Sequence, residues 1–254
     1  MATREQPEMQ LLVSVRGPAD ARAALIGGAD VIDAKDPRRG ALGAVSPVAL
    51  AAIRRAVGSA RPVSAALGDA ATEPAVARRA RAAARHGLAF VKVGFAGVRS
   101  EARVRGLAAA ARRGAGTGAR LVLVAYADWG RIGSLAPERL VAAAAEVGAA
   151  GVLLDTAQKP ASLFALEPPD VVAAWVAGAH EAGLFAALAG GLADADLATA
   201  RELGADVVGV RGAACIGGRL GRVAPERVAT LLALARATSG PPVGALPLHP
   251  LRLS

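Results

Sequence analysis

Short apolar runs, many of them rich in Val, Leu and Ile, alternate along the chain with longer Ala-rich stretches in which apolar residues recur at helical spacing. The apolar runs predict eight strands, over residues 11–15, 30–35, 62–67, 90–95, 120–126, 151–155, 184–190 and 206–212. The stretches between and after them predict helices near residues 18–27, 47–58, 74–87, 99–113, 136–148, 169–182, 193–203 and 224–237. The chain is therefore predicted to consist of eight consecutive βα units.

Several predicted helices end in a glycine that is followed at once by the next strand, as in "GGAD", "HGLAF", "VGAAG" and "LGAD". Strands that are almost continuous in apolar residues, each followed by a helix, are typical of a parallel sheet covered by helices. Eight such units in 254 residues favour a closed barrel over an open sheet. A G-x-G-x-x-G motif is missing after the first strand, which argues against a dinucleotide-binding fold. We predict the α/β class, with a single (β/α)8 TIM barrel.

The length of the chain suits one domain. We predict a barrel over residues 11–237, a flexible N-terminus over 1–10 and a Pro/Gly-rich tail over 238–254. The apolar runs are too short to span a membrane, and the N-terminal residues lack the apolar segment of a signal peptide. We therefore expect a cytoplasmic protein without a membrane partner. The sequence is compatible with a homo-oligomer and does not specify one.

The net charge of +9 raises the question of nucleic acid. The arginines are spread along the predicted helices, and aromatic residues are only 3% of the chain, so few side chains can stack on bases. We expect no nucleic-acid partner. The single cysteine, Cys215, excludes an internal disulfide, and three histidines far apart in sequence predict no metal site.

Lysine is rare in this basic chain. Only Lys35, Lys92 and Lys159 are lysine, and all the other basic residues are arginine. All three are predicted at the carboxyl ends of barrel strands, where TIM barrels place their chemistry. Because side chains alternate along a strand, Asp33 and Lys35 should both face the interior, as should Lys92, and Asp155 ends the sixth strand.

A lysine amine can lose its proton and attack a carbonyl, whereas a guanidinium stays protonated. We therefore predict a Schiff-base site in which one lysine forms an imine, another moves protons, and the carboxylates orient and balance them. No cofactor is required. The alternative is structural: a lysine at a strand end can be an exposed loop residue, and an aspartate can cap a helix. For Lys159 the two interpretations are equally well supported.

Glycines gather after the last two predicted strands, in "LAGGL" and "VRGAACIGGRLGR". Barrels frequently bind phosphate here through backbone N–H groups. The candidate phosphate-binding residues are Gly190, Gly191, Arg211, Gly212, Gly217 and Gly218, with Arg211 as the counter-charge. Glycines also make plain tight turns, but together with the amines they indicate a phosphorylated carbonyl substrate.

Five segments, "GGADVIDAKDPRRGALGA", "VKVGF", "AYADWGRIGSL", "LLDTAQK" and "ADVVGVRGAAC", resemble in the same order the (5-formylfuran-3-yl)methyl phosphate synthase family. The resemblance extends from about residue 11 to about residue 235. It implies a cofactor-free TIM barrel that joins two molecules of glyceraldehyde 3-phosphate, through a lysine imine, into a phosphorylated furan aldehyde of methanofuran biosynthesis.

The resemblance also implies roles for single residues. The lysine of "IDAK", Lys35, corresponds to the Schiff-base residue, with Asp33 beside it, and the lysine of "VKVG", Lys92, corresponds to the proton acceptor. Asp155 and Lys159, in "LLDTAQK", correspond to supporting acid–base groups. Where the family carries a lysine after "AAC", this chain has Ile216 and a shorter loop.

We therefore predict a cofactor-independent carbon–oxygen lyase acting on triose phosphates. One alternative is another Schiff-base class I aldolase acting on sugar phosphates. An alternative of a different class is a non-catalytic barrel that binds phosphate or nucleic acid. Tyr126 and Asp128 are expected to face the mouth of the barrel and to contact substrate, although Tyr126 is equally suited to pack against a lid. Asp69 and Arg131 are similar cases.

Overall fold

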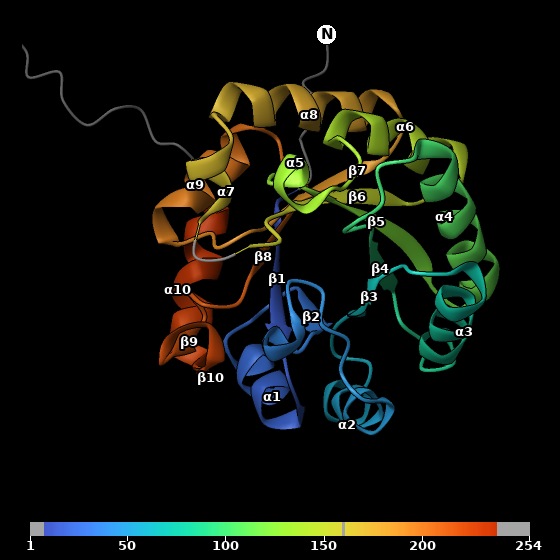
Figure 1. The fold of residues 1–254 in the computed structure, drawn as a ribbon. Coiled ribbons are helices and arrows are strands. Elements are labelled where there is room, and N and C mark those ends of the chain that lie inside the picture. Colours follow the sequence, from blue (N-terminus) through green and yellow to red (C-terminus); the bar gives the residue numbers. More distant parts are fainter. Residues whose placement is uncertain (1–7, 159–160, 238–254) are drawn as a thin grey trace, which may run out of the picture.

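The computed structural model describes residues 8–158 and 161–237. Eight parallel strands close into a barrel in the order of the chain (Figure 1), which confirms the predicted TIM barrel. The predicted tail, 238–254, lies outside the described residues. The strands are β1 (Gln10–Val15), β2 (Val31–Ala34), β3 (Val63–Asp69), β4 (Phe90–Gly94), β5 (Arg120–Tyr126), β6 (Gly151–Asp155), β7 (Phe185–Leu188) and β8 (Val207–Val210).

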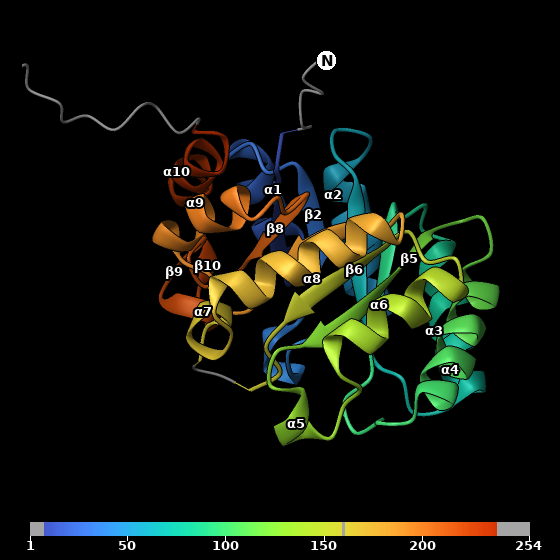
Figure 2. The same cartoon turned by 90° about the horizontal axis from the view of Figure 1, so that it is seen from above.

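In the described part of the chain, eight longer helices surround the barrel, each close to its predicted position (Figures 1 and 2). They are α1 (Pro18–Ile26), α2 (Pro47–Val57), α3 (Glu73–Ala84), α4 (Glu101–Ala115), α6 (Pro137–Glu146), α8 (Pro169–Glu181), α9 (Asp194–Glu202) and α10 (Pro225–Arg236). Hydroxyl side chains cap the N-termini of α2, α3 and α4: Ser46, Thr72 and Ser100 each accept a hydrogen bond from a backbone N–H of the first turn. Glycines with positive φ, Gly58 and Gly116, end α2 and α4.

Short helices and strands lie in the loops that follow β2, β5, β6 and β8. The sequence did not predict them. They are η1 (Pro37–Arg39), α5 (Trp129–Ile132), α7 (Leu163–Leu166), the strands β9 (Cys215–Ile216) and β10 (Arg222–Val223), and η2 (Gly218–Leu220) between those two strands. In Figure 2, α5 and α7 lie beyond the carboxyl ends of β5 and β6, so these loops build the mouth of the barrel.

The apolar core has two parts, one on each side of the strands. Ile32 and Ala34 pack outward among the apolar side chains beneath the helices. A second set of apolar residues fills the interior of the barrel, among them Ala66, Val122, Val124, Leu153 and Ala187. Alternation along a strand therefore decides which polar residues enter the interior.

Aromatic rings close the end of the barrel opposite the mouth. Phe90 and Phe185 meet edge to face with their centroids 5.3 Å apart, and the Arg120 guanidinium lies 4.4 Å from the centroid of the Phe90 ring. A Cβ atom at Gly151 would come within 2.6 Å of the Phe185 ring, so glycine makes room for this floor. The polar groups of the interior consequently lie between an aromatic floor and the open mouth.

Candidate active site

A buried carboxylate, that of Asp33, organises the polar interior. The strand register places Ser14 of β1, Asp33 of β2 and Ser64 of β3 side by side. The Ser14 hydroxyl donates to Asp33 Oδ2 over 3.1 Å, and the Ser64 hydroxyl donates to Asp33 Oδ1 over 2.8 Å. Lys92 Nζ, from β4, lies 2.7 Å from Asp33 Oδ2. Asp33 thus holds an amine at a fixed point inside the barrel.

Burial and charge act on the two members of this ion pair in different ways. Burial alone would raise the pKa of Asp33, but the charges of Lys92 and Lys35 and the hydrogen bonds from Lys92 and Ser64 bring it below its usual value of 3.8. Burial lowers the pKa of Lys92, the charge of Lys35 lowers it further, and Asp33 opposes both. Asp33 is therefore a carboxylate, and Lys92 gives up its proton more easily than an exposed lysine.

Lys35 follows directly after β2 and borders two spaces. Its backbone N–H donates to the Val15 carbonyl over 3.0 Å, which continues the pairing of β2 with β1. Lys35 borders, together with Lys92, a narrow space of about 30 Å³ inside the barrel. It also lines a cavity of about 400 Å³ at the mouth, which we call the mouth cavity. Of the two amines, that of Lys35 is the one placed to meet a molecule entering from the mouth.

Asp155, the last residue of β6, is buried in the wall of the mouth cavity. Its Oδ1 accepts a hydrogen bond from the Thr156 backbone N–H over 2.7 Å. The negative charge of Asp155 favours the protonated form of Lys92. The structure therefore brings Asp33, Lys35, Lys92 and Asp155 to one end of the barrel, while Lys159 lies outside the described residues.

Three of the predicted phosphate-binding glycines line the mouth cavity: Gly190, Gly191 and Gly212. Gly190 and Gly191 have φ values of +103° and +68°, a backbone conformation that residues with a side chain rarely adopt. Two further glycines that we predicted to bind phosphate, Gly217 and Gly218, are not among the described residues that line the mouth cavity. Gly217 follows β9 and Gly218 begins η2, again with positive φ, so in the structure they shape the turn between β9 and β10.

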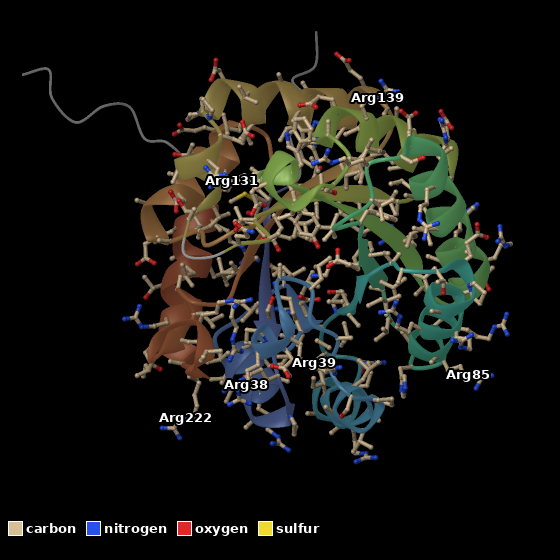
Figure 3. All side chains as sticks on the ribbon, in the orientation of Figure 1. Arg38, Arg39, Arg85, Arg131, Arg139 and Arg222 are labelled. Carbon is tan, nitrogen blue, oxygen red and sulfur yellow. The ribbon has the colours of Figure 1, made fainter. Side chains whose placement is uncertain are left out.

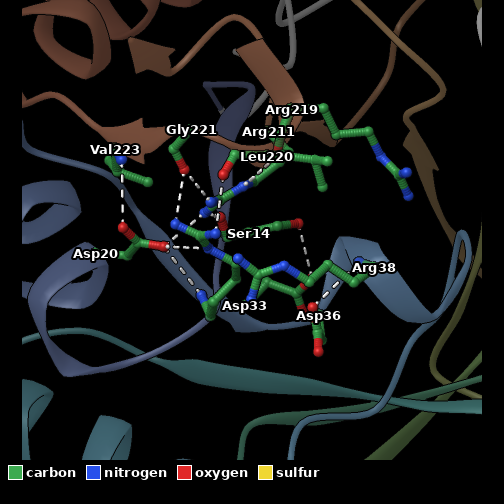
Figure 4. Close-up of polar contacts among 11 residues, drawn as sticks. Ser14, Asp20, Asp33, Asp36, Arg38, Arg211, Arg219, Leu220, Gly221 and Val223 are labelled. Carbon is green, nitrogen blue, oxygen red and sulfur yellow. Dashed lines mark hydrogen bonds and ion pairs between the residues drawn. The ribbon is translucent and has the colours of Figure 1, made fainter. Parts of the chain in front are cut away.

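Arg211 borders the mouth cavity, but its guanidinium is turned into the protein (Figure 4). It donates from Nη1 to the Ser14 carbonyl and to Asp20 Oδ2, from Nη2 to the Gly221 carbonyl and from Nε to the Arg219 carbonyl. Four of the five N–H donors that a guanidinium carries are thus engaged. This arrangement fits a residue that holds the loop better than the predicted counter-charge for a phosphate.

Comparison with known proteins identifies the family of the chain. Residues 11–232 match the family described as 4-HFC-P synthase. The chain belongs to this family. A (5-formylfuran-3-yl)methyl phosphate synthase from Methanopyrus kandleri is 40% identical over 211 residues, which are 81% of this chain and 89% of the relative. A relative from Streptomyces griseus subsp. griseus is 41% identical over 235 residues, which are 89% of this chain and 94% of the relative.

A solved structure shares the fold. Orotidine 5'-phosphate decarboxylase from Pyrococcus horikoshii aligns with a TM-score of 0.62 and 16% identity, over 90% of this chain and 100% of that chain. At that identity the likeness supports the barrel architecture alone. Among the described residues, no group of three His, Cys, Asp or Glu side chains is arranged to hold a metal ion. None of the described helices is long and apolar enough to cross a membrane.

Sequence reasoning missed the two serines that hold Asp33. Ser14 and Ser64 each stand alone in an apolar strand, "LLVSV" and "PVSAAL", at the same inward parity as the charged residues. A lone polar residue in an interior position was therefore a signal that the sequence offered. The sequence did not indicate which residue each serine contacts, because contacts between strands depend on register, which the pattern of one strand does not specify.

Tyr126 and Asp128, which we expected near the mouth, are both fixed by other residues. The Tyr126 hydroxyl donates to Asp69 Oδ1 over 2.7 Å; burial first, and then the charge of Asp69, raise its pKa well above the usual value. The Asp128 carboxylate accepts hydrogen bonds from the backbone N–H groups of Ala157 and Gln158, each over 2.8 Å. Tyr126 thus stays protonated, and Asp128 fixes the beginning of the loop after β6.

The stability of the protein should fall in acid because of Asp33. Its pKa in the folded protein is below 3.8, so in acid the unfolded chain binds a proton that the folded protein does not. The stabilisation is complete above that value and is lost as the pH falls through the lower, folded pKa. Urea unfolding from neutral pH downward should show a steeper acid loss for the wild type than for Asp33→Asn. Equal slopes would contradict this contribution.

Proposed function

We propose that the chain condenses two molecules of glyceraldehyde 3-phosphate into (5-formylfuran-3-yl)methyl phosphate, an early intermediate of methanofuran biosynthesis, as a cofactor-independent lyase. The formulae, two of C3H7O6P against one of C6H7O6P, balance with the loss of one phosphate and two waters. The family membership supports the product. The observation that carries the chemistry is the buried Lys92–Asp33 pair beside Lys35.

In this proposal Lys35 forms the Schiff base. Its neutral amine attacks the aldehyde carbon of one triose phosphate, and water leaves as the imine forms. Its place between the mouth cavity and the barrel interior supports this role, because the aldehyde approaches from the mouth and the resulting imine points toward Lys92. Hydrolysis of the imine at the end returns the amine.

Lys92 then takes the proton from the carbon next to the imine, which leaves an enamine. The enamine carbon attacks the terminal carbon of the second triose, from which phosphate has been eliminated to leave an unsaturated aldehyde, and forms the new carbon–carbon bond. Burial supports Lys92 as the base because it favours the neutral amine, and Asp33 supports the protonated state that follows. The Ser14 and Ser64 hydroxyls keep the Asp33 carboxylate aimed at Lys92 throughout.

Asp155 and Lys159 are proposed to assist the proton transfers that expel water and phosphate before the ring closes. The position of Asp155 in the wall of the mouth cavity supports its part. The backbone at Gly190, Gly191 and Gly212 is proposed to receive a phosphate group, since a backbone without side chains lets an anion approach closely.

Incubation of the pure protein with glyceraldehyde 3-phosphate should generate an ultraviolet-absorbing furan aldehyde and release inorganic phosphate in equal amounts. Mass spectrometry of the product and a phosphate assay measure the two. A sugar phosphate without phosphate release would instead identify a class I aldolase. Neither product, together with salt-dependent binding to nucleic acid, would point to a non-catalytic barrel.

A further inference from the structure

Two arginine side chains, those of Arg16 and Arg211, bind backbone carbonyls of the loop after β8. The carbonyl of Arg219 accepts from Arg211, that of Leu220 accepts from Arg16, and that of Gly221 accepts from both arginines. Asp20 completes the cluster, because it accepts from Arg16, Arg211 and the Val223 backbone N–H (Figure 4). Three successive carbonyls of this loop therefore face α1 and β1.

The Arg219 side chain leaves this loop in a different direction. In Figure 4 it extends away from Asp20, and its Nη2 donates over 2.9 Å to the Gly40 carbonyl, in the loop after β2. It thereby bridges the loops that follow the last and the second strand. Arg219 is one of the residues that line the mouth cavity, and its backbone N lies 3.8 Å from the position that a Cβ atom would take at Gly212.

Few charged groups line the mouth cavity. Among the described residues of its wall they are Lys35, Asp155, Arg211 and Arg219. In the proposed function Lys35 binds the carbonyl carbon of the substrate, and the negative charge of an aspartate such as Asp155 repels a phosphate. Four of the five N–H donors of Arg211 already make hydrogen bonds within the protein. The Arg219 side chain makes one hydrogen bond among the described residues, so most of its guanidinium donors remain available to a ligand.

We propose that Arg219 is the side chain that binds a phosphate group of the substrate, opposite the backbone of Gly190 and Gly191. A guanidinium presents paired N–H donors that match two oxygens of a phosphate. Arg16, Asp20 and Arg211 are positioning residues that hold the loop so that Arg219 faces the cavity. This inference deepens the proposed function and rests on it for the identity of the phosphorylated substrate.

Titration with inorganic phosphate tests the contact without any turnover. Isothermal calorimetry should show phosphate binding to the wild type that is weakened roughly 10- to 100-fold in Arg219→Ala, as expected for a lost hydrogen bond between charged groups. Arg222→Ala is the matched control: Arg222 is exposed on β10, points away from the barrel in Figure 3, and carries the same charge. Its affinity for phosphate should equal that of the wild type.

Arg219→Gln keeps a donor for the Gly40 carbonyl and removes the charge, so weak binding in this variant as well would assign the loss to the guanidinium and not to a loosened loop. Thermal unfolding shows whether each variant is folded. Unchanged phosphate affinity in both Arg219 variants, an equal loss in Arg222→Ala, or no phosphate binding by the wild type would overturn the inference. None of these results depends on furan formation, which is measured separately; failure of that assay would reject the proposed reaction and leave the phosphate contact standing.

Discussion

Replacement of Lys35 by arginine should abolish furan formation and leave a folded protein that retains its positive charge at the mouth. A guanidinium does not lose its proton at any accessible pH, so it cannot attack an aldehyde. Loss of a covalent nucleophile typically lowers the rate by about 10³-fold or more. Initial rates of furan formation measure this loss. Borohydride reduction in the presence of glyceraldehyde 3-phosphate should label the wild type and fail to label Lys35→Arg.

The rarity of lysine makes the adduct easy to locate, since peptide mapping has three lysines to distinguish. Lys35→Cys offers a stricter test, because alkylation with 2-bromoethylamine rebuilds an amine of nearly the original length and should restore turnover. The wild type treated in the same way is the control: its single cysteine, Cys215, is buried. An adduct on Lys92, or full turnover by Lys35→Arg, would contradict the proposal.

Each barrel strand and each long helix could be predicted from the sequence, because each repeats one periodicity over several residues. The alternation in "VIDAK" predicts that Ile32 and Ala34 pack against the helices and that Asp33 faces the barrel interior, and the structure agrees. The elements that were missed, such as α5 and η2, span three or four residues. That is too short for a period to be visible, and tertiary contacts decide their form.

The candidate site was predictable in its residue types and only partly in its contacts. Inward parity placed Asp33 and Lys92 in the same interior, but their ion pair also requires the register of β2, β3 and β4, which single strands do not encode. Arg211 shows the opposite case. Its place in a glycine-rich loop indicated a phosphate ligand, whereas the fold turns its guanidinium toward Asp20, a residue 191 positions away.

Removal of one member of the buried ion pair should destabilise the protein far more than removal of both. Asp33→Ala leaves the Lys92 amine buried without its carboxylate, and Lys92→Met leaves the Asp33 carboxylate without its amine. Either should lower the free energy of unfolding by about 3–5 kcal/mol. In the double variant no buried charge remains from the pair, so we expect a free energy of unfolding close to that of the wild type. All three variants should lack turnover, because the base or its partner is gone.

Urea unfolding of the wild type, the two single variants and the double variant forms a closed cycle that isolates the interaction between the two side chains. An exposed pair supplies the control: Arg113 Nη2 lies 3.5 Å from Glu73 Oε2 with both side chains largely in solvent. Arg113→Ala should therefore change the free energy of unfolding by about 1 kcal/mol or less. If the losses at Asp33 and Lys92 simply add in the double variant, the two groups do not hold each other inside the barrel. Lys92 would then lack the fixed position beside Lys35 from which a proton can be taken.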